Sequence, residues 1–362
     1  MSQLNTRFLP GRLGDAGLNL RDDPRADKRM LAAMEARGLL EPIPALPIDA
    51  ESTIDELLAF CAENEAVYEE MNEEAMRNLP PVLGVSKETR TIKGVDDNDI
   101  ILYIHRPGNI SGPLPGILHL HGGGMVLMSA AGSLYDRWRC ELAASGLLVV
   151  GVEFRNAAGK LGPHPYPAGL NDCCSALYWM ADNATDLNIS GVIVSGESGG
   201  GNLSLATCLK ANLDKRVDTI SGVYAQCPMI SNNYLDKSPE LPSLFENDDF
   251  GLNCAMMGAL SKVYDPTGNN QTNPLTWPLH AQQNELIGLP SHFVSVCQLD
   301  PLRDEGLAYT SKLVAAGVTA SSRTINGVTH AADMIYRMEM PDVYLSSIGD
   351  IKRFAEFVCT GD

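Results

Sequence analysis

Residues 192–202 read VIVSGESGGGN, and they decide the fold of this chain. The apolar run at 192–195 predicts a buried strand, and the residues from Gly199 onward predict a helix. A reversal this tight needs glycine on both sides of Ser198, because a Cβ atom there would clash with neighbouring backbone. The segment therefore predicts a nucleophile elbow that presents the serine hydroxyl, although G-x-S-x-G also occurs by chance.

Strands and helices alternate on both sides of this elbow. Strands are predicted at 100–105, 116–121, 147–154, 220–226, 292–299 and 320–325, and helices at 167–181, 199–213, 305–316 and 343–359. Such alternation implies a mostly parallel sheet flanked by helices, with right-handed crossovers. The predicted fold class is α/β, with the chemistry at the carboxyl edge of the sheet.

Two segments interrupt the alternation and are predicted to form a helical cap. The first is 1–85, with helices expected around 28–37 and 51–75; the second is the insertion 229–282, with a Met-rich helix near 253–263. The catalytic domain is accordingly assigned to 86–228 and 283–362.

The helix at 51–75 carries nine carboxylates and no Lys or Arg. Its apolar positions follow helical spacing and are Ile54, Leu57, Leu58, Cys61 and Tyr68. This stripe is expected to pack on the catalytic domain while the nine carboxylates face water. Asp49 or Ser52 is expected to cap the helix.

A serine nucleophile needs a base and an acid that orients the base, and in this fold the chain order is serine, acid, histidine. Asp300 directly follows the predicted strand 292–299, and His330 is the only histidine after it. Asp304 is a second acidic candidate, but it is better explained as the cap of the next helix. Ser198, Asp300 and His330 are therefore the predicted catalytic triad.

The sequence His121-Gly122-Gly123-Gly124-Met125 follows the predicted strand 116–121. In this fold the loop at that place donates backbone N–H groups to the oxyanion, so Gly123 and Gly124 are the expected donors, together with Gly199. The alternative is that the three glycines form only a flexible turn.

Met125 and Met128 are predicted to contact the substrate, with core packing as their alternative role. Glu197 is expected to be structural, bonding backbone or a polar neighbour beneath the elbow.

The three motifs together resemble the hormone-sensitive-lipase-like branch of the α/β-hydrolases. The resemblance is carried by HGGG at 121–124, GESGGGN at 196–202 and DPLRDEG at 300–306, and it extends from about residue 25 to the C-terminus. It implies a carboxylic-ester hydrolase that forms an acyl-enzyme, with oxyanion amides at Gly123, Gly124 and Gly199. Met125 departs from the aromatic residue common in the family, and Ala331 replaces the glycine that usually follows the histidine.

Alternatives on the same fold stay open from the sequence. A lactonase, an amidase or a peptidase could use the same triad, and a non-catalytic ligand receptor could share the fold. The presence of His330 argues against the receptor.

Composition limits the partners. The net charge of −18 disfavours nucleic acid and anionic membranes, and the N-terminus has no apolar run typical of a signal peptide. The nine cysteines include no CxxC pair or Cys/His cluster, so neither a metal nor a cofactor is expected. Reduced thiols indicate a cytoplasmic protein whose partner is a small-molecule ester. A homodimer is left open.

Overall fold

An eight-stranded sheet forms the centre of the computed structural model, which describes residues 9–41, 46–48, 51–108, 110 and 112–360. Its strand order is β1-β2-β4-β3-β5-β6-β7-β8. The strands are β1 (Val85–Lys93), β2 (Asp99–Pro107), β3 (Leu114–Leu120), β4 (Leu148–Glu153), β5 (Ile189–Glu197), β6 (Gly222–Gln226), β7 (Ser291–Cys297) and β8 (Ala320–Ile325). β2 is antiparallel to β1 and to β4, and every other pairing is parallel. The predicted mostly parallel sheet is confirmed.

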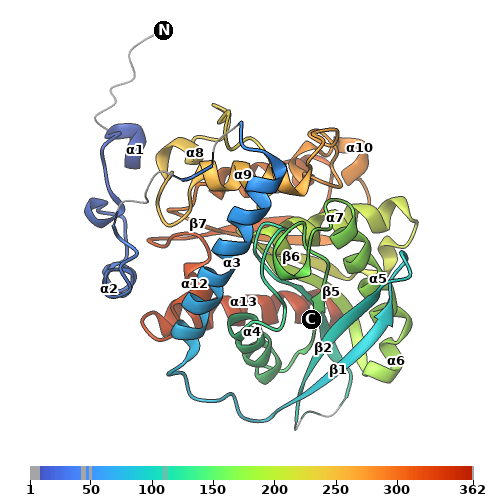
Figure 1. Ribbon diagram of the computed structural model, residues 1–362. Helices are drawn as coiled ribbons and strands as arrows, with labels where there is room; N and C mark the ends of the chain where they lie inside the picture. The colour runs from blue at the N-terminus through green and yellow to red at the C-terminus, as the bar shows by residue number, and fades with distance from the viewer. Residues whose placement is uncertain (1–8, 42–45, 49–50, 109, 111, 361–362) are drawn as a thin grey trace.

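Helices cover both faces of this sheet (Figure 1). They include α4 (Ser133–Ala144), α5 (Ala168–Asp182), α7 (Gly199–Leu213), α11 (Arg303–Ala315) and α13 (Pro341–Thr360). Side chains alternate along each central strand, so Ile193 joins the core beneath α4 and α13, whereas Val194 joins the larger core on the other face. Each central strand is therefore buried on both sides, as parallel sheets require.

β1 and α4 are among the elements that the sequence analysis did not predict. In β1 only Ile92 is buried, so the strand lacks the apolar alternation that predicts strands. α4 carries four charged residues within its twelve, which obscure its apolar face; one of them, Arg139, is itself buried. Both elements owe their position to long-range packing.

α3 (Ile54–Met76) is the acidic helix of the N-terminal region, and it crosses the front of the molecule in Figure 1. It begins at a capping box, in which Thr53 accepts from the Glu56 N–H and the Glu56 carboxylate accepts from the Thr53 N–H at 2.8 Å. The expected cap at Ser52 is therefore wrong, and Asp49 lies outside the described residues. Leu57 and Cys61 of the apolar stripe are buried as expected.

Glu65 contradicts the expectation that all nine carboxylates face water. Its side chain is buried and accepts hydrogen bonds from the backbone N–H groups of Met128 and Lys160, each at 2.8 Å. Buried N–H groups need acceptors, and here one carboxylate of the helix accepts from two loops elsewhere in the chain. Glu65 therefore attaches α3 to the segment that follows β3.

The other helices of the N-terminal region and of the insertion pack beside the carboxyl edge of the sheet. α2 (Lys28–Ala36) is capped by Asp27, and its Met30 and Met34 join a small core with Phe250 and Val328. α1 (Gly11–Gly14) lies against α8 (Ser243–Glu246) in the insertion, which also holds the expected Met-rich helix, α9 (Cys254–Tyr264) (Figure 1). Among the described residues, no helix has the length and apolar character needed to cross a bilayer.

Candidate active site

Ser198 lies between β5 and α7 in a strained backbone conformation. Its φ is 57° and its ψ is −118°, in a region that side-chain-bearing residues seldom adopt. Neighbouring strands fix this conformation, because the Ser198 N–H donates to the Gln226 carbonyl at 2.9 Å and its own carbonyl accepts from the Met229 N–H at 3.1 Å. The elbow predicted from the sequence is present, with α7 beginning directly after the serine.

Glycine at 199 and 200 allows the elbow to touch the loop after β3. A Cβ atom on Gly199 would lie 2.5 Å from the Met125 nitrogen and 2.6 Å from the Gly124 nitrogen. A Cβ atom on Gly200 would lie 1.9 Å from the Leu120 carbonyl oxygen. All three separations are shorter than van der Waals contact, so the two backbones can approach only because these side chains are absent.

Glu197 bonds this loop from beneath. One carboxylate oxygen accepts from the Gly122 N–H at 2.8 Å, and the other lies 3.1 Å from Nε2 of His119. All three residues are buried or nearly so, which makes the acceptor necessary for the Gly122 N–H. This pairing agrees with the structural role expected for Glu197.

His121 also fixes the loop. Its Nδ1–H donates to the Gly122 carbonyl at 2.8 Å, and its ring stacks on Phe154 with centroids 4.2 Å apart. Burial lowers the pKa of His121 to about 4, so the ring stays neutral at pH 7. Among the hydrogen bonds of the described chain, none uses the N–H of Gly123, Gly124 or Gly199. These three amides therefore have no acceptor within the described chain.

The structure brings Asp300 and His330 together. Nδ1 of His330 lies 2.7 Å from one Asp300 oxygen, and the other Asp300 oxygen accepts from the Leu302 N–H at 2.9 Å. Burial acts to lower the pKa of His330, but the adjacent Asp300 carboxylate and the Cys227 sulfur outweigh burial and raise it above its ordinary value. The Asp300 side chain is fully buried, whereas that of His330 is 13% exposed.

One cavity of about 910 Å³ contains Ser198 and His330 together with Gly123 and Gly124. Its apolar lining comes from the N-terminal region, the insertion and the catalytic domain, and includes Tyr68, Met71, Leu127, Met128, Phe250, Met256, Met257, Leu260 and Ile335. A volume of this order accommodates a ligand of drug-like size. The cavity therefore joins the predicted nucleophile and base to a mainly apolar surface.

Three expectations about individual residues have different outcomes. Met128 lines the cavity, whereas Met125 is buried and, like Gly199, is not among its lining residues. Asp304 is not the cap of α11, which begins at Arg303; its carboxylate instead accepts from the Ser243 N–H at 2.7 Å. Asp304 is thus engaged with the insertion and not with His330.

Sequence reasoning missed two buried groups beside the predicted triad. Cys227 offers a sulfur within 4.8 Å of the ligand atoms of Asp300 and His330, so these three form one of two groups among the described residues whose spacing suits a metal ion. Glu305 accepts from the Ile230 N–H and the Tyr234 hydroxyl, each at 3.1 Å, and burial raises the pKa of its carboxyl to about 8. Neither contact follows from sequence spacing, because each partner lies on a distant segment.

Comparisons with known proteins agree with this geometry. The family described as having the α/β-hydrolase fold matches residues 117–334. Carboxylesterase NlhH of Mycobacterium tuberculosis is 32% identical over 246 residues, which cover 67% of this chain and 73% of that protein. An arylesterase of Saccharolobus solfataricus is 32% identical over 256 residues, which cover 67% of this chain and 76% of that protein.

A solved structure is similar over almost the whole chain. Brefeldin A esterase, described as a bacterial homologue of human hormone-sensitive lipase, is 40% identical with a TM-score of 0.95, covering 98% of this chain and 99% of that one. The structure of esterase Est22 is 32% identical in sequence with a TM-score of 0.82, and the match covers 94% of this chain and 99% of that one. The resemblance inferred from the sequence motifs is confirmed, and the chain belongs to the hormone-sensitive-lipase-like branch of the α/β-hydrolases.

Proposed function

We propose that this protein hydrolyses carboxylic esters of small to medium size, with Ser198 as nucleophile, His330 as general base and Asp300 as the acid that orients it. The observation that carries the proposal is the joint placement of Ser198, His330 and unpaired loop amides in one apolar cavity. Two relatives named carboxylesterase and arylesterase support an ester as the substrate.

The reaction follows from the positions of these groups. His330 takes the hydroxyl proton as the Ser198 oxygen attacks the ester carbonyl, and a tetrahedral oxyanion forms. The same proton then passes to the leaving alcohol, the carbon–oxygen bond breaks, and an acyl-enzyme remains. Water, activated by His330, releases the acid. Asp300 keeps Nδ1–H of the imidazole oriented and stabilises the transient imidazolium.

The oxyanion would be held by the N–H groups of Gly123, Gly124 and Gly199. All three come from backbone that the elbow contact and Glu197 hold in place before substrate arrives, and α7 adds the positive end of its dipole. Such preorganised donors need no rearrangement in the transition state, and each is typically worth about 2.7–4 kcal/mol.

The N-terminal region and the insertion would form the cap that sets ester preference. Tyr68 and Met71 of α3 and Met256 and Met257 of α9 line the same cavity as Ser198. Because methionine side chains adapt their shape, this lining suits acyl or alcohol groups of varied form. Glu65 bonds the Met128 N–H, and Met128 also lines the cavity, so α3 and the pocket wall are linked directly.

We also propose a reducing, cytoplasmic location. All nine cysteines are free and eight of them are buried, which suits a compartment that keeps thiols reduced.

Ser198→Ala should lower ester turnover by several orders of magnitude while leaving the melting temperature nearly unchanged. The reason is that the hydroxyl attacks the substrate and is not needed for packing of the core. Hydrolysis of a p-nitrophenyl ester series and labelling by a fluorophosphonate measure this. A peptide map of the wild-type enzyme that places the label on another serine would contradict the assignment.

The acid limb of kcat/KM against pH should lie above the ordinary histidine pKa of about 6.5. The base must be neutral to accept the serine proton. Burial acts to lower the pKa of His330, but the Asp300 carboxylate outweighs burial and raises it. Activity is therefore lost as the pH falls through that raised pKa. Asp300→Asn should shift the limb downward and lower kcat. An unchanged limb in this variant would show that Asp300 is not the partner of the base.

Glu197→Leu should lower both kcat and the free energy of unfolding, because it leaves the buried Gly122 N–H without an acceptor at a cost of about 1–3 kcal/mol. Glu197→Gln is the matched control, since its amide oxygen can still accept that bond. Steady-state kinetics and denaturant unfolding are the measurements. Equal behaviour of the two variants would show that the acceptor at Gly122 is unimportant.

Glu65→Leu should change the ester-length profile more than it changes the rate on the shortest ester, because it detaches α3 from Met128. Each of the two N–H groups left unpaired should also cost about 1–3 kcal/mol of stability. Glu65→Gln can keep one acceptor and should fall between wild type and Glu65→Leu in both measurements. A destabilised variant with an unchanged length profile would remove α3 from the specificity of the enzyme.

A further inference from the structure

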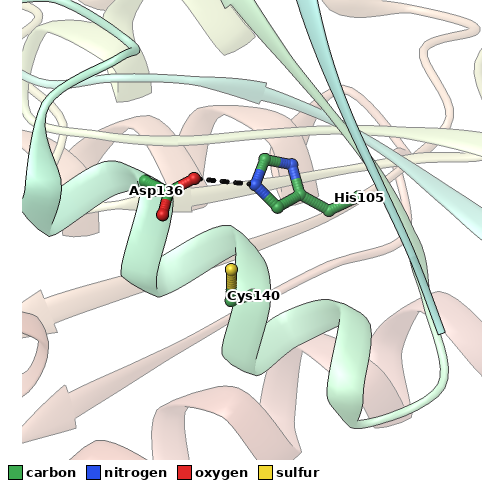
Figure 2. A group of neighbouring side chains, drawn as sticks. All are labelled: His105, Asp136 and Cys140. Carbon is green, nitrogen blue, oxygen red and sulfur yellow. Dashed lines mark hydrogen bonds and ion pairs between the residues drawn. The ribbon is translucent and has the colours of Figure 1, made fainter. Parts of the chain in front are cut away.

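A second group of ligand-type side chains lies on the opposite side of the sheet from α7, between β2 and α4. It consists of His105, Asp136 and Cys140, whose ligand atoms all lie within 4.8 Å of one another (Figure 2). Asp136 and Cys140 are four residues apart on α4 and so share one helix face. None of the three lines the catalytic cavity.

His105 has oxygen at both ring nitrogens. Nε2 lies 3.0 Å from an Asp136 carboxylate oxygen, and Nδ1 lies 3.3 Å from the Tyr103 carbonyl oxygen. A neutral imidazole has a single N–H, so it can satisfy only one of these oxygens. A cation bound at Nε2, with Nδ1–H donated to Tyr103, would resolve the conflict.

The other two groups complement His105. The Asp136 carboxylate accepts from the Lys87 ammonium at 2.6 Å, so it already holds one cation. Cys140 is buried, and a bound metal would hold its sulfur as the thiolate. Nitrogen, sulfur and oxygen ligands in one group suit zinc and not magnesium or calcium, which prefer oxygen alone.

We propose that His105, Asp136 and Cys140 bind a zinc ion, with solvent as the fourth ligand. The Asp136 side chain is 37% exposed, which gives both an entry route and room for that solvent. Tetrahedral zinc bonds of ordinary length separate ligand atoms by roughly 3.3–3.7 Å, so the 3.0 Å contact between His105 and Asp136 must open by only a few tenths of an ångström. The ion would join β2 to α4.

Lys87 is the competitor for this position. Its ammonium donates to Asp136 at 2.6 Å, and it lies opposite His105 in the ladder between β1 and β2. The lysine side chain is about half exposed, so it can leave for solvent when an ion binds. Arg139 also places a buried positive charge nearby. Zinc with one carboxylate and one thiolate ligand forms a neutral centre, and the thiol proton of Cys140 leaves for solvent as the ion binds.

Cobalt(II) titration of the full-length enzyme, stripped of metal with a chelator, tests the proposal. Cobalt replaces zinc in such sites and gives a near-ultraviolet thiolate charge-transfer band, which zinc lacks. One equivalent should produce the band, zinc should displace it, and zinc should raise the melting temperature. Esterase activity should stay constant during the titration, because the site lies outside the cavity.

Four variants separate this site from other thiols. Cys140→Ser should remove the band, and His105→Gln should weaken binding at least tenfold, given that even outer-shell changes cost roughly 10–100-fold. Lys87→Met should tighten binding severalfold by removing the competing cation. Cys227→Ser is the matched control and should keep the band, since Cys227 belongs to the group beside the triad.

The outcomes that overturn the proposal are distinct. A band that survives Cys140→Ser, or one lost in Cys227→Ser together with inhibition of the esterase, would place the metal elsewhere. Absence of both cobalt and zinc binding in wild type and in Lys87→Met would show that the three side chains form an ion-pair cluster only. The melting temperature of each metal-free variant shows whether the fold is intact.

Discussion

The carboxylate of Glu197 joins the two backbone segments on which the catalytic geometry depends. These segments are the turn after β3 and the elbow after β5, and they meet where the Gly122 N–H and His119 both face that carboxylate. A buried anion is stable only when donors surround it, so the elbow and the loop cannot separate without leaving this charge unpaired. The amides of Gly123 and Gly124 are held near Ser198 as a consequence.

The strain at Ser198 depends on a second set of contacts at the same elbow. A residue with φ of 57° and ψ of −118° persists only when its surroundings fix it, and here the β6 carbonyl of Gln226 and the N–H of Met229 do so on either side of the residue. The packed helix α7, buried along almost its whole length, prevents relaxation in the other direction. The strained backbone of Ser198, the close contact between the elbow and the loop after β3, and the buried Glu197 carboxylate thus lie at one junction of the structure.

What could be predicted from the sequence is what depends on local chemistry. The elbow at Ser198 follows from strand, glycine and helix signals within eleven residues, and Asp300 and His330 follow from their order after it. Glu65 could not be foreseen in the same way: it looks like one more exposed acid on an acidic helix, and only the approach of the Met128 and Lys160 amides makes it a buried acceptor. His105 and Cys140 likewise meet only because β2 packs on α4. Met125 does not line the cavity, and this could not be predicted because it depends on the backbone conformation of the loop and not on sequence spacing.

Contacts between the N-terminal segment and the loop of His330, the proposed base, lead us to infer that specificity and catalysis are not independent in this enzyme. The Asp27 N–H donates to the Gly327 carbonyl at 2.8 Å, and the N–H of Thr329, next to His330, lies 3.4 Å from the Met30 sulfur. The N-terminal segment therefore packs on the loop that carries the base as well as on the pocket wall at Met128. A substrate that displaces this segment would also disturb the imidazole, whereas one that fits beneath it leaves Asp300 and His330 aligned. Selection by size would then act through the position of the base as well as through the volume of the cavity.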